Sequence, residues 1–229
     1  MIAFRGKGDN STLTAASLAI TPHASTVAGD LMLAVVTVRT GNSLDNAITP
    51  PGGWSLIDGG YDAGTPGVRC NTYRKTAGSS EGAASFSFGT SNEACGSILS
   101  YSGVNTSSPV HVSAVDVQVA GSTARSTPSI SVSESGCWVV SYFADRSGST
   151  WTGPDTERSE VRVPATSASQ VVCDSAAAVA AGSVSRSATA SASTSVAVNG
   201  IIALRPAAAP GAVPPPPGLP RSLRTLLTR

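Results

Sequence analysis

Charged and aromatic side chains are scarce in this sequence. Asp, Glu, Lys and Arg together make up 13% of the 229 residues, whereas soluble domains usually carry about a quarter. The 15 basic and 14 acidic residues leave a net charge of +1. This balance argues against general binding to nucleic acid, which needs a basic excess. Phe, Trp and Tyr contribute only 5%.

Long apolar runs and helix-forming segments are also missing. The first ten residues do not resemble a secretory signal. The longest strongly apolar run, residues 31–38, is too short to cross a bilayer. We therefore expect a product made in the cytoplasm that does not associate with membranes. Periodic segments rich in Leu, Glu, Lys and Ala are lacking, so helices are excluded as the main element. The abundant Ser, Thr, Gly and Val favour an all-β protein.

The familiar catalytic and cofactor motifs are absent too. No HExxH, P-loop or GxGxxG pattern occurs, and the GxSxG match at residues 78–82 lacks the following helix pattern of a nucleophile elbow. Both histidines, His23 and His111, stand beside turn-forming prolines and are expected in loops or at strand edges. Four widely spaced cysteines without a CxxC pair predict buried apolar side chains rather than a zinc site; they are Cys70, Cys95, Cys137 and Cys173. We therefore predict that the chain is not an enzyme and needs no cofactor or metal.

Several acidic residues beside turns are candidates for glycoside hydrolysis or calcium binding. Hydrolysis needs two facing carboxylates, and nothing in the sequence pairs these acids. Calcium would accept such loop oxygens, but no DxDxD run supports a site. We favour solvated turn acids for the whole set, which comprises Asp58, Asp62, Asp145, Asp155 and Glu157.

An internal duplication with a period of about a hundred residues is the most informative pattern. Thr21 is answered by Thr127, the segment starting at Gly29 by the one starting at Gly136, and Ile48 by Trp151. Cys70 falls opposite Cys173, and Gly96 opposite Gly200. The five offsets are 106, 107, 103, 103 and 104 residues, a collinear series that chance does not supply. The halves span about 1–105 and 106–205.

Each half consists of short strand patterns separated by turn residues. Residues 31–39 are almost continuously apolar and β-branched, which predicts a central strand covered on both faces. The low-complexity stretch 177–195 is read as strand, turn and strand, because that interpretation preserves the duplication. We therefore predict an all-β fold: a two-layer antiparallel β-sandwich, jelly-roll-like, forming one body over residues 1–205.

The chain changes character at residue 206. The tail, residues 206–229, holds seven of the 15 prolines and three arginines without an acid, while the body has 12 basic and 14 acidic residues. A stiff polyproline spacer at Pro214, Pro215, Pro216 and Pro217 precedes a Leu/Arg segment of the kind that docks on partners. We predict that the tail anchors the body to a larger assembly, through the spacer and Leu219, Arg221, Leu223, Arg224, Leu226 and Leu227.

Carbohydrate binding is the alternative function. β-Sandwiches commonly hold sugars on exposed aromatic rings, and Tyr61 and Trp151 are the best candidates for exposed rings, although packing in the core or a loop is the favoured interpretation even for these two. The alternative is therefore an adhesin that contacts a host surface glycan through these two residues.

One ordered series of motifs carries a resemblance. It runs from Gly29-Asp30-Leu31-Met32-Leu33 through Pro50-Pro51-Gly52-Gly53-Trp54 and Tyr73-Arg74-Lys75 to Tyr101-Ser102-Gly103-Val104, and closes with Ala203-Leu204-Arg205-Pro206. Over residues 1–206 the chain resembles β-sandwich virion structural proteins, of the minor tail or head-decoration type, of tailed phages and prophages of actinobacteria. The resemblance implies a non-enzymatic virion protein that is displayed on capsid or tail and is present as a homo-oligomer or in many copies. Other virion proteins would then be the partners of the C-terminal tail.

Overall fold

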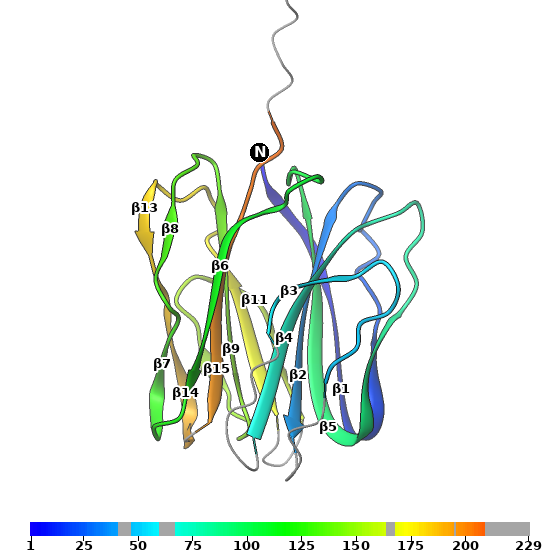
Figure 1. The fold of residues 1–229 in the computed structure, drawn as a ribbon, viewed down its shortest axis with the longest axis vertical. Helices are drawn as coiled ribbons and strands as arrows, with labels where there is room; N and C mark the ends of the chain where they lie inside the picture. Colours follow the sequence, from blue (N-terminus) through cyan, green and yellow to red (C-terminus); the bar gives the residue numbers. More distant parts are fainter. Residues whose placement is uncertain (41–46, 60–66, 164–167, 195, 209–229) are drawn as a thin grey trace, which may run out of the picture.

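Every regular element in the described part of the chain is a β-strand. The computed structural model describes residues 1–40, 47–59, 67–163, 168–194 and 196–208. These ranges contain fifteen strands and no helix (Figure 1). The strands are β1 (Ala3–Ile20), β2 (Leu31–Thr40), β3 (Ser55–Asp58), β4 (Gly67–Thr76), β5 (Ala84–Ser102), β6 (Val110–Gln118), β7 (Ser122–Ser126), β8 (Ile130–Val132), β9 (Trp138–Asp145), β10 (Trp151–Thr152), β11 (Thr156–Arg162), β12 (Ser169–Asp174), β13 (Gly182–Val184), β14 (Ser187–Thr194) and β15 (Ala197–Leu204).

Two five-stranded antiparallel sheets form the centre of the molecule. The first has the order β1-β5-β2-β4-β3, and the second has the order β11-β12-β9-β15-β6. The first sheet lies to the right in Figure 1 and the second to the left. Because β1 lies against β11 and β3 lies against β6, the stacked sheets have two edges, which we call the β1–β11 edge and the β3–β6 edge.

One hydrophobic core lies between the two sheets. Alternate residues of β2, such as Leu33 and Val35, meet Val140 and Tyr142 of β9 in a single buried cluster. The period of two follows from the pleat, which sends successive side chains to opposite faces. The structure is thus an all-β, sandwich-like fold, as the composition predicts.

The outer faces of both sheets are covered as well, so a description with two layers is incomplete. Met32 and Val36 of β2 pack outward against Leu18 and Phe86, in the folded-over parts of β1 and β5. The second sheet is covered by two smaller sheets, β13-β8 and β10-β14-β7. Central strands buried on both faces result, and every described side chain of β2 except Arg39 is buried.

The two central sheets share one strand order. In the first sheet, β5 lies between β1 and β2, and β4 and β3 follow outward from β2. In the second sheet, β15 lies between β6 and β9, and β12 and β11 follow outward from β9. Register shifts occur at matching places, after Leu56 in β3 and after Glu157 in β11. Gly29 and Gly136, just before β2 and β9, both have a positive φ, of 88° and 83°, which favours glycine.

The strand registers correct two of the matches drawn from sequence. Val35 of β2 pairs with Thr72, and Tyr142 of β9 pairs with Val172, so β4 and β12 differ by 100 residues and Cys70 matches Gln170 rather than Cys173. Similarly, Val35 pairs with Ser97 and Tyr142 pairs with Gly200, so the residue equivalent to Gly200 is Ser97 and not Gly96. Because the offsets differ by one and three residues, both odd numbers, the matches drawn from sequence join residues on opposite faces of their strands: Cys70 lies between the sheets and Cys173 lies in an outer cluster.

Buried polar side chains cross the core between the sheets. Gln170 of β12 is fully buried; its Oε1 accepts from Thr37 Oγ1 (2.8 Å), and its Nε2 donates to Val35 O and Ser97 Oγ (both 3.2 Å). Ser97 Oγ in turn lies 2.6 Å from Ser159 Oγ of β11. Because unpaired buried polar groups are costly, this network fixes how the two sheets sit on each other.

The predicted strands and buried cysteines are largely confirmed. The stretch 177–195 contributes β13 and β14, as the strand-turn-strand interpretation requires. All four cysteines are buried and free, and burial raises the pKa of Cys70 and Cys173 to about 12. Within the described ranges, no helix is long and apolar enough to cross a membrane.

Candidate functional site

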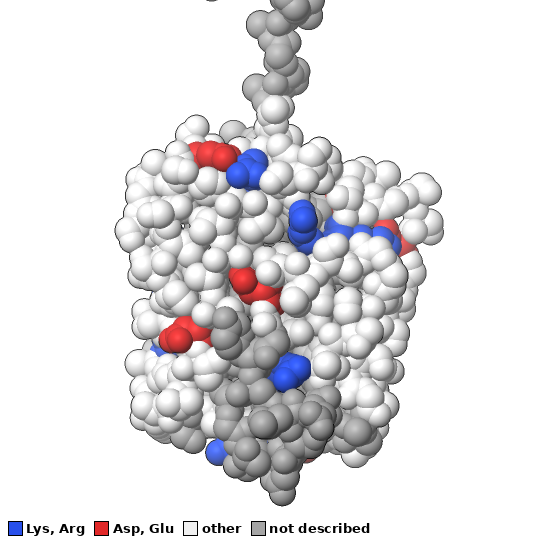
Figure 2. Space-filling model, in the orientation of Figure 1, with Lys and Arg blue, Asp and Glu red and all other residues white. Residues whose placement is uncertain are grey.

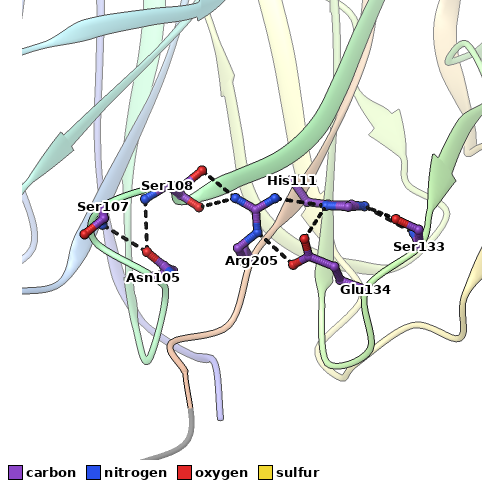
Figure 3. Close-up of polar contacts among 7 residues, drawn as sticks. All are labelled: Asn105, Ser107, Ser108, His111, Ser133, Glu134 and Arg205. Carbon is purple, nitrogen blue, oxygen red and sulfur yellow. Dashed lines mark hydrogen bonds and ion pairs between the residues drawn. The ribbon is translucent and has the colours of Figure 1, made fainter.

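The point where the C-terminal segment leaves the body is held by a polar cluster around Arg205 (Figure 3). Arg205 follows β15, and its Nε donates to Glu134 Oε2 at 2.7 Å. Its Nη1 donates to Ser108 O at 3.0 Å and also contacts Ser108 Oγ. The hydrogen bond from Arg205 holds the pKa of Glu134 below its ordinary value. One guanidinium thus joins β15 to the segment between the halves and to the β8–β9 connection.

His111 of β6 completes this cluster. The backbone N–H of Ser133 donates to His111 Nε2 at 3.2 Å. On the other side of the ring, Nδ1 lies 3.2 Å from Arg205 Nη2 and 3.3 Å from Glu134 Oε1. His111 is therefore an edge-strand residue, as predicted, and His23 lies in a turn with Nδ1 2.7 Å from Ser25 Oγ.

Backbone contacts fix the chain for three residues beyond β15. Asn105 N donates to Arg205 O (2.9 Å), and Ala207 N donates to Gly103 O (2.8 Å). Pro206 forms an isolated bridge with Val104. Figure 1 shows that this segment ends beside the N-terminus, at one end of the molecule. Whatever follows residue 208 therefore starts from a defined point on the body.

A groove opens next to this exit, at the β3–β6 edge. Its larger cavity, of about 450 Å³, lies between Ser55 and Lys75 on one side and Thr106 and Ser107 on the other, with Leu31 and Pro109 as apolar lining. A smaller cavity of about 210 Å³ continues between Leu56, Ile57, Val110 and Ser113. Arg74 of β4 lines both cavities, so the two form one elongated groove.

The charge in this groove is basic. Lys75 Nζ is paired with Glu81 Oε2 at 2.7 Å, but Arg74 has no carboxylate partner among the described residues. Figure 2 shows basic atoms in the upper half of this face, with acidic ones beside and below them on a largely uncharged surface. Asp58, at the end of β3, keeps a buried Oδ2 without a hydrogen-bond partner.

The opposite β1–β11 edge is closed by an ion pair. Arg158 of β11 makes two hydrogen bonds to the fully buried Asp174 of β12, from Nε to Oδ2 (2.8 Å) and from Nη2 to Oδ1 (2.9 Å). The guanidinium also lies 4.5 Å from the ring centre of Phe4 in β1. Further along, Ser159 Oγ donates to Asp9 Oδ1 at 2.7 Å. These contacts tie β11 to both β12 and β1 along this edge.

The two edges are built from matching strands. Leu33 of β2 pairs with Arg74, and Val140, at the matching position of β9, pairs with Asp174. Arg74 and Asp174 are therefore counterparts on the same face of their sheets. Ile57, at the register shift of β3, likewise matches Arg158 of β11. A basic side chain thus stands at one edge where an acidic one stands at the other.

Most of the residues predicted to carry function lie outside the part of the chain that the structure describes. All of the anchoring residues, from Pro214 to Leu227, and the aromatic Tyr61 lie outside the described residues. Trp151, the other ring considered for sugar contact, is buried, in agreement with the favoured core interpretation. It is 7% exposed, packs with Phe143 and Ala190, and donates from Nε1 to Ser169 Oγ (3.2 Å). Pairing of β10 with β14 turns the ring inward, so it offers no face to a sugar.

The turn acids differ in exposure. Asp145 is fully buried, contrary to the expectation of a solvated acid, and accepts hydrogen bonds from Ser147, Ser149 and Ser169. Asp155 pairs with Arg186, Glu157 is exposed, and Asp62 lies outside the described residues. No cluster of three potential metal ligands occurs in the described parts of the chain.

No protein-family model, curated protein or solved structure matches the chain. The resemblance to virion proteins therefore rests on the sequence pattern alone. Sequence reasoning missed both Arg74 and Arg205 as candidate functional residues. Arg74 could have been found by aligning the two halves correctly, because that alignment makes it equivalent to Asp174. The correct alignment, however, follows from the strand pairing and not from the sequence.

Proposed function

We propose that this chain is a non-enzymatic structural protein of a phage virion, displayed on capsid or tail and tethered through residues 209–229. The observation that carries the proposal is the fixed exit of the chain. Arg205 is held from three sides, and Ala207 is still hydrogen-bonded to the body. A tether that starts at a fixed point transmits the position of its anchor to the body, whereas a frayed end would not.

The surface supports the same proposal. Few charged groups lie on the face drawn in Figure 2, and most described acids are paired with a neighbouring base or with hydroxyl groups. A hydroxyl-rich surface of low charge suits a protein held in many copies at high local concentration. The partners of the tail would be capsid or tail subunits.

We also propose that the two halves arose by internal duplication, which would make the body a jelly-roll-like sandwich of two related units. Support comes from the shared strand order, from the register shifts at Leu56 and Glu157, and from the paired glycines Gly29 and Gly136. These features are backbone geometry rather than residue identity, so they persist after the sequences have diverged.

The test is a deletion of residues 209–229 in the phage that encodes the chain. The deletion spares Ala207 and all described contacts of the body, so thermal unfolding of the purified variant should match that of the full chain. We expect its copy number on purified particles, measured by quantitative mass spectrometry, to fall at least about tenfold, since docking peptides concentrate binding energy in few anchors.

Two substitution variants sharpen this experiment. Replacing Leu223, Leu226 and Leu227 by Ser should reproduce the loss, because the predicted apolar anchors are gone. Replacing Thr225 and Thr228 by Ser keeps the length and the leucines, and should leave incorporation unchanged. Normal incorporation of the deletion variant would overturn the proposal. Incorporation lost equally in both substitution variants would overturn the assignment of the leucines as anchors.

A further inference from the structure

At the β3–β6 edge, Arg74 has no ion-pair partner among the described residues, whereas Asp174, at the equivalent position of the other edge, has one. At the β1–β11 edge, Asp174 receives two hydrogen bonds from Arg158. At the β3–β6 edge, Arg74 stands at the matching place, but Ile57 occupies the position of Arg158. The arrangement therefore presents a cation, half-buried in a groove, that lacks a carboxylate among the described residues.

The groove has the shape of a site for an extended chain. Its two cavities, of about 450 and 210 Å³, share Arg74. The smaller cavity lies between the edge strands β3 and β6, and the larger one lies between the start of β3, the end of β4 and the loop that precedes β6. An edge strand leaves half of its backbone N–H and C=O groups without a partner in its own sheet. Leu56 of β3 is 53% exposed here. A small free anion would use Arg74 but neither the length of the groove nor the strand edge.

We propose that the β3–β6 groove binds an extended acidic segment of a partner protein, which adds to the edge of β3 and places a carboxylate on Arg74. Strand addition of this kind gains affinity from main-chain hydrogen bonds and specificity from alternate side chains. The carboxylate and Arg74 form the type of paired contact that Asp174 and Arg158 form at the other edge. The hydroxyl groups of Ser55, Thr106 and Ser107 border the same groove.

This inference deepens the proposed structural role, because it gives the body a protein contact separate from the tail. The basic tail is a poor occupant of the groove: it carries three arginines and no acidic side chain, so Arg74 and Lys75 would repel it. The acidic partner is therefore a segment of another protein.

The experiment is selection of a displayed library of random 12-residue peptides on the full-length protein. Enriched peptides are synthesised, and their Kd is measured by fluorescence polarisation at two salt concentrations. We expect the enriched sequences to share an Asp or Glu flanked by β-branched residues. Their affinity should fall about tenfold in the Arg74→Gln variant, which corresponds to about 1.4 kcal/mol.

Two further variants make the outcome specific. Arg162→Gln removes an exposed cation of β11, which lies at the β1–β11 edge and not at the groove. This variant should leave the affinity unchanged. Ser55→Asp places a carboxylate directly across from Arg74, and should weaken binding as much as Arg74→Gln does. Thermal unfolding of each variant checks that the fold is intact.

Several results would overturn the proposal. They are a selection that enriches no acidic peptide, equal affinity for the wild type and Arg74→Gln, and an equal loss in Arg162→Gln. Binding of an acidic oligosaccharide such as polygalacturonate, without any peptide, would assign the groove to a different class of ligand. Deleting residues 209–229 should not change peptide affinity, so failure of the tether and failure of the groove are distinguishable.

Discussion

The two edges of the stacked sheets are built from corresponding strands and differ in what fills them. At the β1–β11 edge, Arg158 and Asp174 pair across β11 and β12, and Phe4 covers the guanidinium. At the β3–β6 edge, Ile57 and Arg74 take the corresponding places and a groove remains. The same backbone frame therefore gives a closed edge when opposite charges face each other and an open one when a single charge is left.

This difference shows how two sheets with the same strand order can separate stability from recognition. A buried, doubly hydrogen-bonded ion pair is costly to break, so one edge is held firmly. An exposed or half-buried lone cation contributes little to folding, so the other edge is free to serve an external partner. Each of the four changes below alters one edge and leaves the other intact.

The largest effect is expected for Asp174→Ala. This change leaves Arg158 without its buried acceptor and opens a cavity beside Phe4, so the free energy of unfolding should fall by about 3 kcal/mol. Chemical denaturation monitored by tryptophan fluorescence measures it. The matched control is Asp155→Ala, which breaks the more exposed pair with Arg186 and should cost under about 1 kcal/mol. Equal losses in the two variants would refute the special role of the closed edge.

Ser159→Ala should have an intermediate effect. The hydroxyl is buried between Asp9 and Ser97 and hydrogen-bonds both, so its removal should lower the free energy of unfolding by about 1 kcal/mol. The double variant Ser159→Ala with Ser97→Ala tests the coupling. Because the single change already breaks the Ser97–Ser159 contact, the second should cost less than it does alone; strict additivity would argue against a connected network.

Ser55→Asp should stabilise the open edge slightly. Ser55 lies directly across from Arg74 in the β3–β4 ladder, and opposite charges in such cross-strand pairs contribute about 0.2–1 kcal/mol. Thermal unfolding at low and at high salt is the measurement, and the gain should shrink when salt is added. A destabilised variant would indicate that Arg74 already has its charge balanced.

Arg74→Gln should have the smallest effect on folding. Its side chain has no carboxylate partner in the described part of the chain, and substitutions at such sites usually change stability by less than about 0.5 kcal/mol. Calorimetric unfolding compares this variant with the wild type. A loss near that of Asp174→Ala would show that Arg74 is a structural residue, and would remove the contrast between the edges.

Much of the fold was predictable because the pattern of apolar and polar residues within a short segment indicates a strand and its buried faces. The continuous apolar run at 31–39 predicts a strand buried on both faces, and β2 is one. Breaks in long strands were harder to judge: the residues around Gly89 suggest a turn, yet β5 continues through it from Ala84 to Ser102 with a positive φ of 74° at Gly89. A glycine can bend a strand as well as end it.

The candidate site was not predictable, because it depends on contacts between distant segments. Arg205 was visible only as part of a terminal motif, while its partners Ser108 and Glu134 lie 97 and 71 residues away. Core packing was favoured for Trp151 without indicating where the ring would lie, and the small side chains Ala188 and Ala190 of β14 leave room for it beneath the sheet. Side-chain burial of this kind is decided by the partner strand.

The strand order also determines when the body can be completed. In each half the last strand to be made, β5 or β15, takes a place between the first and second long strands. β1 and β2 therefore do not pair with each other, and the pairings that join each of them to β5 span 56 to 99 residues of sequence. Such non-local pairing slows folding to the range of milliseconds to seconds. Because β15 is followed at once by Arg205, the exit cluster needs the final strand in place, and we expect the tail to gain its fixed starting point only when the second sheet is complete.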